Sequence, residues 1–149
     1  MGLYDTLGVG ASGLAAQRAR VEALTENIAN SETTRTPQGG PYQRRRVVFE
    51  SAPAAQSFGA VLSRARSRID GRALEGVRVA RLEFETAAPE MRFEPDHPDA
   101  DKAGYVAYPG FNPIEDMVDL TASVRSYQAN LAVIDAVRQM INATIDVTR

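Results

Sequence analysis

Two apolar stripes with seven-residue spacing, one at each end of the 149-residue chain, constrain its fold more than any other feature. The stripe near the N-terminus consists of Leu7, Leu14, Val21 and Ile28, with Leu3 and Leu24 at the intervening heptad position. This spacing is typical of helices that pack along one another, and it predicts a helix from about Leu3 to Ile28. Three glycines weaken this helix by about 1 kcal/mol each relative to alanine, so packing has to stabilise it. They are Gly8, Gly10 and Gly13.

The last part of the chain carries a stronger helix signal. Asn112 is a good N-cap, Pro113 suits the first helical position, and Glu115 follows three residues after the cap. The apolar stripe then runs through Met117, Leu120, Val124, Tyr127, Leu131 and Ile134, and continues slightly rotated through Val137, Ile141 and Ile145. These features predict a helix from Pro113 to about Val147, roughly 50 Å long at 1.5 Å per residue. A helix of that length needs a long partner.

The middle of the chain has the composition of β structure. Four segments rich in Val, Phe and Tyr are predicted to be strands: Tyr42 to Glu50, Val77 to Glu85, Met91 to Glu94 and Gly104 to Tyr108. Prolines and glycines between them mark turns. The segment from Phe58 to Ile69 fits a short helix or a loop, and the pattern does not choose between them.

The predicted fold class is therefore α+β, with long N- and C-terminal helices packed as a coiled coil and a small central β-rich domain. The helical domain is expected to comprise residues 1–36 and 112–149, and the β-rich domain residues 37–111. Because the two stripes have matching spacing and comparable length, an antiparallel or crossing pair would bring both termini together.

Composition excludes several function classes. The chain has no cysteine and one histidine, so a disulfide framework and a thiolate zinc site are ruled out. No run of 18 apolar residues predicts a membrane-spanning helix, and no secretory signal pattern is seen at the start. Residues 42–81 hold nine arginines against three acids, whereas residues 82–119 hold ten acids against two basic residues. This asymmetry fits charge pairing within one chain or head-to-tail contact between copies.

Few residues offer catalytic or ligand-binding chemistry. The cluster of Asp96, His97, Asp99 and Asp101 departs from the spacing of a calcium loop and is interpreted as a solvated turn, not a metal site. The run from Arg44 to Arg46 is interpreted as forming salt bridges to acidic neighbours, not as binding nucleic acid. No serine lies in a nucleophile elbow, and no glycine-rich phosphate loop opens a helix. We expect no enzyme activity, no metal and no cofactor.

Four motifs carry a resemblance to a known family. The segment Ala23 to Asn30 resembles the N-terminal signature of bacterial flagellar rod and hook proteins, and Ser31 to Tyr42 continues it as in proximal members of the rod. Two further matches are His97 to Asp101 running into Gly104 to Val106, and Asn112 to Asp119 followed by Tyr127 to Asn130. The chain thus resembles the bacterial flagellar basal-body rod protein family over both ends and much of the middle.

This resemblance implies a structural rod subunit that polymerises through its terminal helices into a hollow drive shaft, which transmits torque and encloses an export channel. The implied partners are copies of itself, other proximal and distal rod subunits, the adaptor to the export gate and MS ring, and the flagellar type III export apparatus. The implied location is the periplasmic rod of the basal body, reached by export without a cleaved signal peptide.

The predicted assembly interface consists of apolar stripe residues and two asparagines of the N-terminal signature. These are Leu7, Leu14, Val21, Leu24, Asn27, Ile28, Asn30, Met117, Leu120, Val124, Tyr127, Leu131, Ile134 and Ile141. Two alternatives remain open at this point. A soluble helical adaptor or binding module would be a monomer with stable end helices, and a small hydrolase would need a convergent pair of acids in a pocket.

Overall fold

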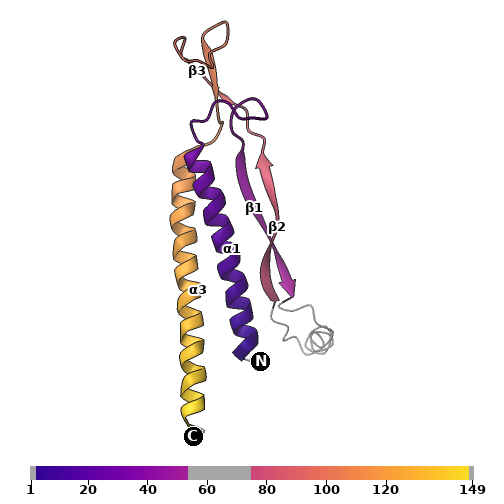
Figure 1. Cartoon of the computed structure of the whole chain (residues 1–149), viewed down its shortest axis with the longest axis vertical. Helices are drawn as coiled ribbons and strands as arrows, with labels where there is room; N and C mark the ends of the chain where they lie inside the picture. The colour runs from indigo at the N-terminus through magenta and orange to yellow at the C-terminus, as the bar shows by residue number, and fades with distance from the viewer. Residues whose placement is uncertain (1–2, 54–74, 148–149) are drawn as a thin grey trace. The chain divides into compact units, whose positions relative to one another are not determined.

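The computed structural model describes residues 3–53 and 75–147 and contains two long helices with four strands between them in sequence (Figure 1). Helix α1 spans Leu3–Ala29 and helix α3 spans Pro113–Val147. These bounds match the sequence predictions within one residue, so the α+β class with terminal helices is confirmed. The segment from Phe58 to Ile69 lies outside the described residues. Neither described helix is long and apolar enough to cross a lipid bilayer.

Local capping explains where the two helices begin and end. At the start of α3, Asn112 Oδ1 accepts a hydrogen bond from the backbone N–H of Ile114 at 3.0 Å, which confirms the predicted N-cap. At the end of α1, the side-chain amide of Asn30 donates to the carbonyl of Glu26 at 2.9 Å. The hydroxyl of Ser31 donates to the carbonyl of Ile28 at 2.8 Å. These side chains therefore add a second hydrogen bond to two carbonyls that already accept a backbone N–H at the end of the helix.

The strands form two separate two-stranded sheets. Strand β1 (Arg44–Pro53) pairs with β2 (Glu75–Glu85), and β3 (Glu90–Phe93) pairs with β4 (Tyr105–Tyr108). The second pair is antiparallel, with Phe93 opposite Tyr105 and Arg92 opposite Val106. All four predicted strands are present, with ends shifted by at most three residues.

The described chain divides into two compact units. The first unit comprises Met1–Ala19, Phe49–Ala80 and Ser123–Arg149, and the second comprises Arg20–Val48 and Arg81–Ala122. Each unit contains part of α1, part of α3 and part of the β1–β2 ribbon. The contacts described below lie within one unit or the other.

Helices α1 and α3 are antiparallel neighbours in the first unit. A Cβ added at Gly10 would lie 3.0 Å from Ile134 Cγ1, and one added at Gly13 would lie 3.0 Å from Asn130 Nδ2. As the residue number rises along α1, the number of the contacting residue on α3 falls, so the two helices run in opposite directions. Two of the glycines that weaken α1 therefore allow α3 to approach it closely, whereas Gly8 has no neighbour within 4 Å. Whether the pair supercoils as a coiled coil stays a prediction.

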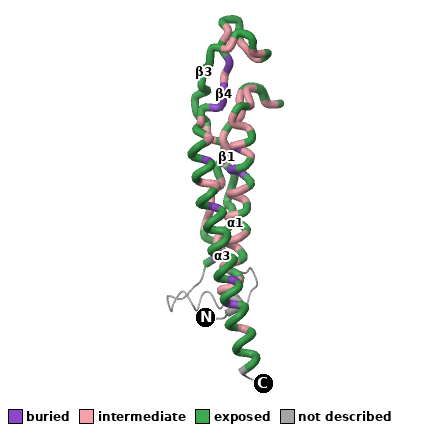
Figure 2. The backbone as a smooth tube through the Cα atoms, turned by 90° about the vertical axis from the view of Figure 1, so that its left-hand side faces the viewer, coloured by how far each residue is buried: buried purple, intermediate pink, exposed green. Residues whose placement is uncertain are grey.

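Buried positions are few among the described residues (Figure 2), and some of them are polar. The apolar ones are Ala16, Ala23, Leu24, Val106, Tyr108, Ile134 and Val137. Three polar residues are also buried, with exposed fractions of 0% for Asn27, 0% for Asp116 and 2% for Ser123. Because many large apolar side chains of the described residues are exposed, much apolar surface faces solvent in the single chain.

Candidate functional site

The predicted interface residues fall into two groups according to their burial. On α1, Leu24 and Asn27 are buried, and the others, Leu7, Leu14, Val21, Ile28 and Asn30, are partly buried. On α3, Ile134 is buried, and Leu120 and Ile141 are partly buried. Four of the predicted interface residues on α3 stay exposed: Met117 at 51%, Val124 at 39%, Tyr127 at 36% and Leu131 at 43%. The α3 stripe is therefore covered along only part of its width.

The face of α3 that is buried within the chain is rotated from the predicted stripe. Its buried members, spaced by seven, eleven and three residues, are Asp116, Ser123, Ile134 and Val137. The neighbouring edge of the helix, formed by Met117, Val124 and Leu131, points to solvent together with Ile114 and Val118. We call Met117, Val124 and Leu131 the exposed edge of α3. Apolar side chains in such a row are typical of a surface that another protein covers.

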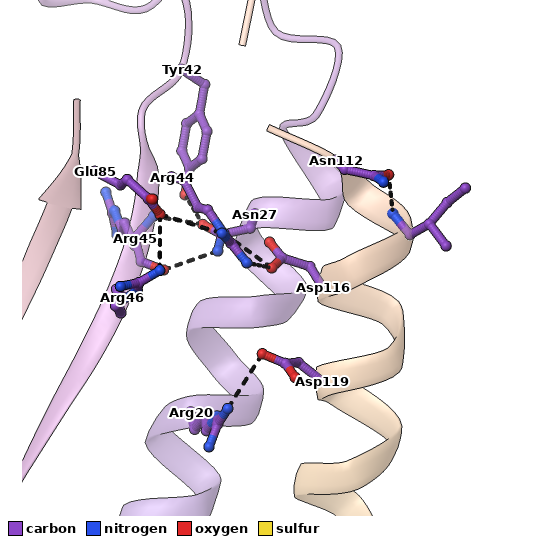
Figure 3. Close-up of polar contacts among 11 residues, drawn as sticks. Arg20, Asn27, Tyr42, Arg44, Arg45, Arg46, Glu85, Asn112, Asp116 and Asp119 are labelled. Carbon is purple, nitrogen blue, oxygen red and sulfur yellow. Dashed lines mark hydrogen bonds and ion pairs between the residues drawn. The ribbon is translucent and has the colours of Figure 1, made fainter. Parts of the chain in front are cut away.

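The side chain of Asn27 joins the end of α1 to the start of β1 (Figure 3). Its Nδ2 donates to the carbonyl of Arg45 at 2.9 Å, and its Oδ1 accepts from the backbone N–H of the same residue at 2.8 Å. The hydroxyl of Tyr42 also donates to Asn27 Oδ1, at 3.0 Å. Asn27, predicted as an interface residue, thus bonds its own chain and has no exposed surface left for a partner.

A buried ion pair joins β1 to the first turn of α3. Arg44 Nε donates to Asp116 Oδ1 at 3.1 Å, its Nη2 contacts the same oxygen, and its Nη1 lies 3.3 Å from Glu85 Oε2 (Figure 3). Burial by itself lowers the pKa of the Arg44 guanidinium, but the hydrogen bond and charge of Asp116, with those of Glu85, raise that pKa above its ordinary value. Arg44 therefore stays charged inside the protein.

The remaining arginines of this run also find acids in their own chain. Arg45 Nη1 lies 2.6 Å from Glu26 Oε2, and Arg46 Nη2 lies 3.4 Å from Glu85 Oε2. The prediction that Arg44, Arg45 and Arg46 form salt bridges is confirmed. The charge asymmetry has two interpretations, pairing within one chain and contact between copies. The contacts of these three arginines are of the first kind. We call Asn27, Tyr42, Arg44, Arg45 and Asp116 the buried polar cluster.

The acidic turn is held by its own hydrogen bonds. Asp101 Oδ1 accepts from the backbone N–H groups of Ala103 and Tyr105, and Asp99 Oδ2 accepts from the Thr34 hydroxyl at 2.8 Å. His97 Nδ1 accepts from the backbone N–H of Asp99 at 3.1 Å. No group of three metal-ligating side chains gathers within residues 3–53 and 75–147. These carboxylates shape a turn.

A cleft of about 560 Å³ opens in the second unit beside the N-terminus of α3. It is lined by the turn at Gly39 and Gly40, by Glu85, and by Phe111 and Asn112. Glu85 is already bonded to Arg44 and Arg46, and Asn112 caps α3. These contacts of Glu85 and Asn112 stabilise the fold.

Sequence reasoning missed Asp116 and the partners of Arg44. A sequence signal existed: Asp116 and Ser123 are seven residues apart on one side of the apolar stripe, but polar residues at such positions are ordinarily assigned to solvent. The pairing of Arg44 with Asp116 spans 72 residues, so no local pattern predicts it.

Comparison with known proteins places these features in a family. Residues 7–35 match the family described as flagella basal body rod protein, and residues 102–147 match the C-terminal family of flagellar basal body rod FlgEFG proteins. The flagellar basal-body rod protein FlgC of Borreliella burgdorferi is 38% identical, with 97% of each chain covered. Those of Bacillus subtilis and Salmonella typhimurium are each 34% identical, with 99% and 97% of each chain covered.

Proposed function

The chain belongs to the FlgC family of flagellar basal-body rod proteins and is a structural rod subunit, and we propose that it polymerises through its terminal helices into a hollow drive shaft. It is not an enzyme, since its relatives are rod proteins. Its place is the basal body of the flagellum. The finer proposal is that the shaft transmits torque and encloses an export channel.

One observation carries this proposal. The exposed edge of α3 leaves Met117, Val124 and Leu131 between 39% and 51% exposed, although they continue an apolar stripe. Covering apolar surface is favourable by roughly 25 cal/mol per Å², so a row of such side chains stabilises association once several are buried together. A monomeric adaptor whose terminal helices bury their apolar stripes within the chain would not be expected to expose such a row. We therefore assign the exposed edge to contact with a neighbouring rod subunit.

The proposed division of labour follows the two kinds of structure. Residues 1–36 and 112–149 would form the tube as a coiled-coil domain, and residues 37–111 would form a β-rich domain outside it. The proposed neighbours are copies of this chain, proximal and distal rod subunits, and the adaptor to the export gate and MS ring. The proposed contact residues on the helices remain the fourteen named from the sequence, with Asn27 acting through its own chain.

The proposed route to the rod is export through the flagellar type III apparatus into the periplasm. Glycines at positions 8, 10 and 13 lower the intrinsic stability of α1, and α1 depends on packing to stay helical. A chain whose helices form only after packing is suited to passage through a narrow channel in an unfolded state.

Thiol protection tests the proposed interface. Because the chain lacks cysteine, Leu131→Cys introduces a single thiol on the exposed edge. In the isolated chain this thiol should react with a bulky maleimide, and in basal bodies purified from a complemented deletion strain it should be protected. Denatured basal bodies provide the control that the thiol is intact. Equal reactivity in folded basal bodies and in the isolated chain would contradict the assignment.

A further inference from the structure

The apolar stripes of α1 and α3 do not define a unique alignment of the two helices. On α1 the stripe repeats at Leu14, Val21 and Ile28, and on α3 it repeats at Leu120, Tyr127, Ile134 and Ile141, always seven residues apart. Sliding one helix by seven residues, roughly 10.5 Å, places each stripe on its own repeat. Apolar packing alone therefore leaves alignments of similar quality, as in coiled coils whose register is fixed by polar residues.

The buried polar cluster does not share this repeat. Seven residues after Asp116 the helix carries Ser123, and seven residues before Asn27 it carries Arg20. A slide by one repeat would therefore face Arg44 with a serine instead of a carboxylate. The exposed contact between Arg20 Nη2 and Asp119 Oδ2, at 3.3 Å, would be lost in the same slide. Asp116, Asp119, Asn27, Arg20 and Arg44 lie in the second unit, and Ser123 is the first residue of the α3 segment in the first unit.

Burial makes such a mismatch costly. Asp116 and Asn27 have no exposed surface, and the side chain of Arg44 is only 17% exposed. A buried charge or amide that loses its partner is strongly unfavourable, whereas an intact buried pair adds little stability over apolar residues of similar volume. Asp116 Oδ2 has no hydrogen-bond partner even in the folded chain. The cluster thus penalises wrong alignments more than it stabilises the right one.

We propose that the buried polar cluster sets the helix register. It selects one axial alignment of α1 against α3 from the alignments that the apolar stripes allow. Asn27 fixes β1 to the end of α1 through the backbone of Arg45. Arg44, on the same strand, binds α3 through Asp116. Strand β1 therefore fixes the axial position of α3 relative to α1, because it is bonded to both helices. This inference concerns the single chain and does not depend on the rod function.

Replacing the pair by apolar residues separates register from stability. In the variant Arg44→Met with Asp116→Leu, no buried charge is left unpaired, because Glu85 keeps Arg46. Spin labels on Thr25→Cys and Val118→Cys, both exposed and in the second unit, report the alignment by pulsed electron resonance. Labelled chains are diluted in unlabelled chains so that only distances within one chain are measured. Circular dichroism and urea unfolding show whether the variant is folded.

The native chain should give one narrow distance, and the variant should give an additional population displaced by up to about 10 Å along the helix. The control Arg78→Met with Glu50→Leu removes an exposed pair of the ribbon and should keep the single distance. A folded variant with the native distance alone would overturn the proposal and would assign the register to the steric contact of Gly10 with Ile134. A variant without cooperative unfolding would also overturn it, because the cluster would then hold the fold together.

Discussion

The side-chain amide of Asn27 bonds the backbone of Arg45 in the way that a residue of a neighbouring strand would. It donates to the carbonyl of Arg45 at 2.9 Å and accepts from the N–H of the same residue at 2.8 Å. An amide side chain thus replaces a backbone pairing partner at the edge of β1. This arrangement explains why an asparagine, and not a larger apolar residue, occupies a fully buried position on the inner side of α1.

We predict that Asn27→Ala lowers the free energy of unfolding by about 1–3 kcal/mol for each group it leaves unbonded, since the N–H and the carbonyl of Arg45 both lose their partner. Urea unfolding of the purified chain measures the change. Thr25→Ala removes an exposed hydroxyl that bonds the carbonyl of Val21 on the same helix and should change stability by less than about 0.5 kcal/mol. Equal effects of the two substitutions would contradict the role of Asn27.

The ion pair of Arg44 allows a comparison between buried and exposed partners. We predict that Asp116→Ala destabilises the chain by about 3 kcal/mol, because Arg44 is left largely buried with Glu85 alone. Arg46→Ala removes an exposed partner of the same Glu85 and should cost about 0–1 kcal/mol. Thermal and urea unfolding of both variants give the comparison, and a smaller loss for Asp116→Ala than for Arg46→Ala would show that the burial of the pair has no energetic consequence.

The order of elements was predictable from the sequence because each has a strong local signal. The seven-residue stripes and the N-cap at Asn112 predict both helices, and segments rich in Val, Phe and Tyr predict the strands. The side of α3 that packs in the chain was not predictable in the same way. Asp116 and Ser123 read as solvent positions until Arg44, far away in sequence, supplies a partner for Asp116. The buried side of α3 is therefore determined by a long-range contact, and the periodicity of the apolar residues predicts that side only approximately.

The stability of α1 should vary along its length in the isolated chain. Its N-terminal half contains Gly8, Gly10 and Gly13, and its C-terminal half ends in the Asn27 contacts. We predict weak protection of its amides from hydrogen exchange in a verified monomer, weakest before Gly13, since each glycine costs about 1 kcal/mol in a helix. Strong and uniform protection of residues 5–28 would show that α1 is stable without neighbouring subunits.

Ionisation of Tyr42 should make the chain less stable in alkali. Burial, followed by the negative charge of Glu26, raises the pKa of the Tyr42 hydroxyl above its ordinary value, which is about 10. Because the folded pKa exceeds the unfolded pKa, this group's contribution to stability is complete below pH of about 10 and is lost as pH rises through the folded pKa. Tyr42→Phe should therefore lose less stability than the native chain between pH of about 9 and 11. Parallel pH profiles of unfolding free energy would contradict this.

Leu131 separates the assembly role of α3 from its role in the single chain. It lies on the exposed edge with 43% of its surface accessible, so Leu131→Asp should change the unfolding free energy of the isolated chain by less than about 1 kcal/mol. In the rod the same aspartate would be covered by a neighbouring subunit without a partner, which is strongly unfavourable. We therefore predict a folded, expressed protein that fails to restore swimming in a deletion strain. Ala136→Asp, exposed and about 140° around the helix, is the matched control and should swim better. Normal motility of Leu131→Asp would remove Leu131 from the interface, and a destabilised isolated chain would show that Leu131 supports the fold of the single chain instead.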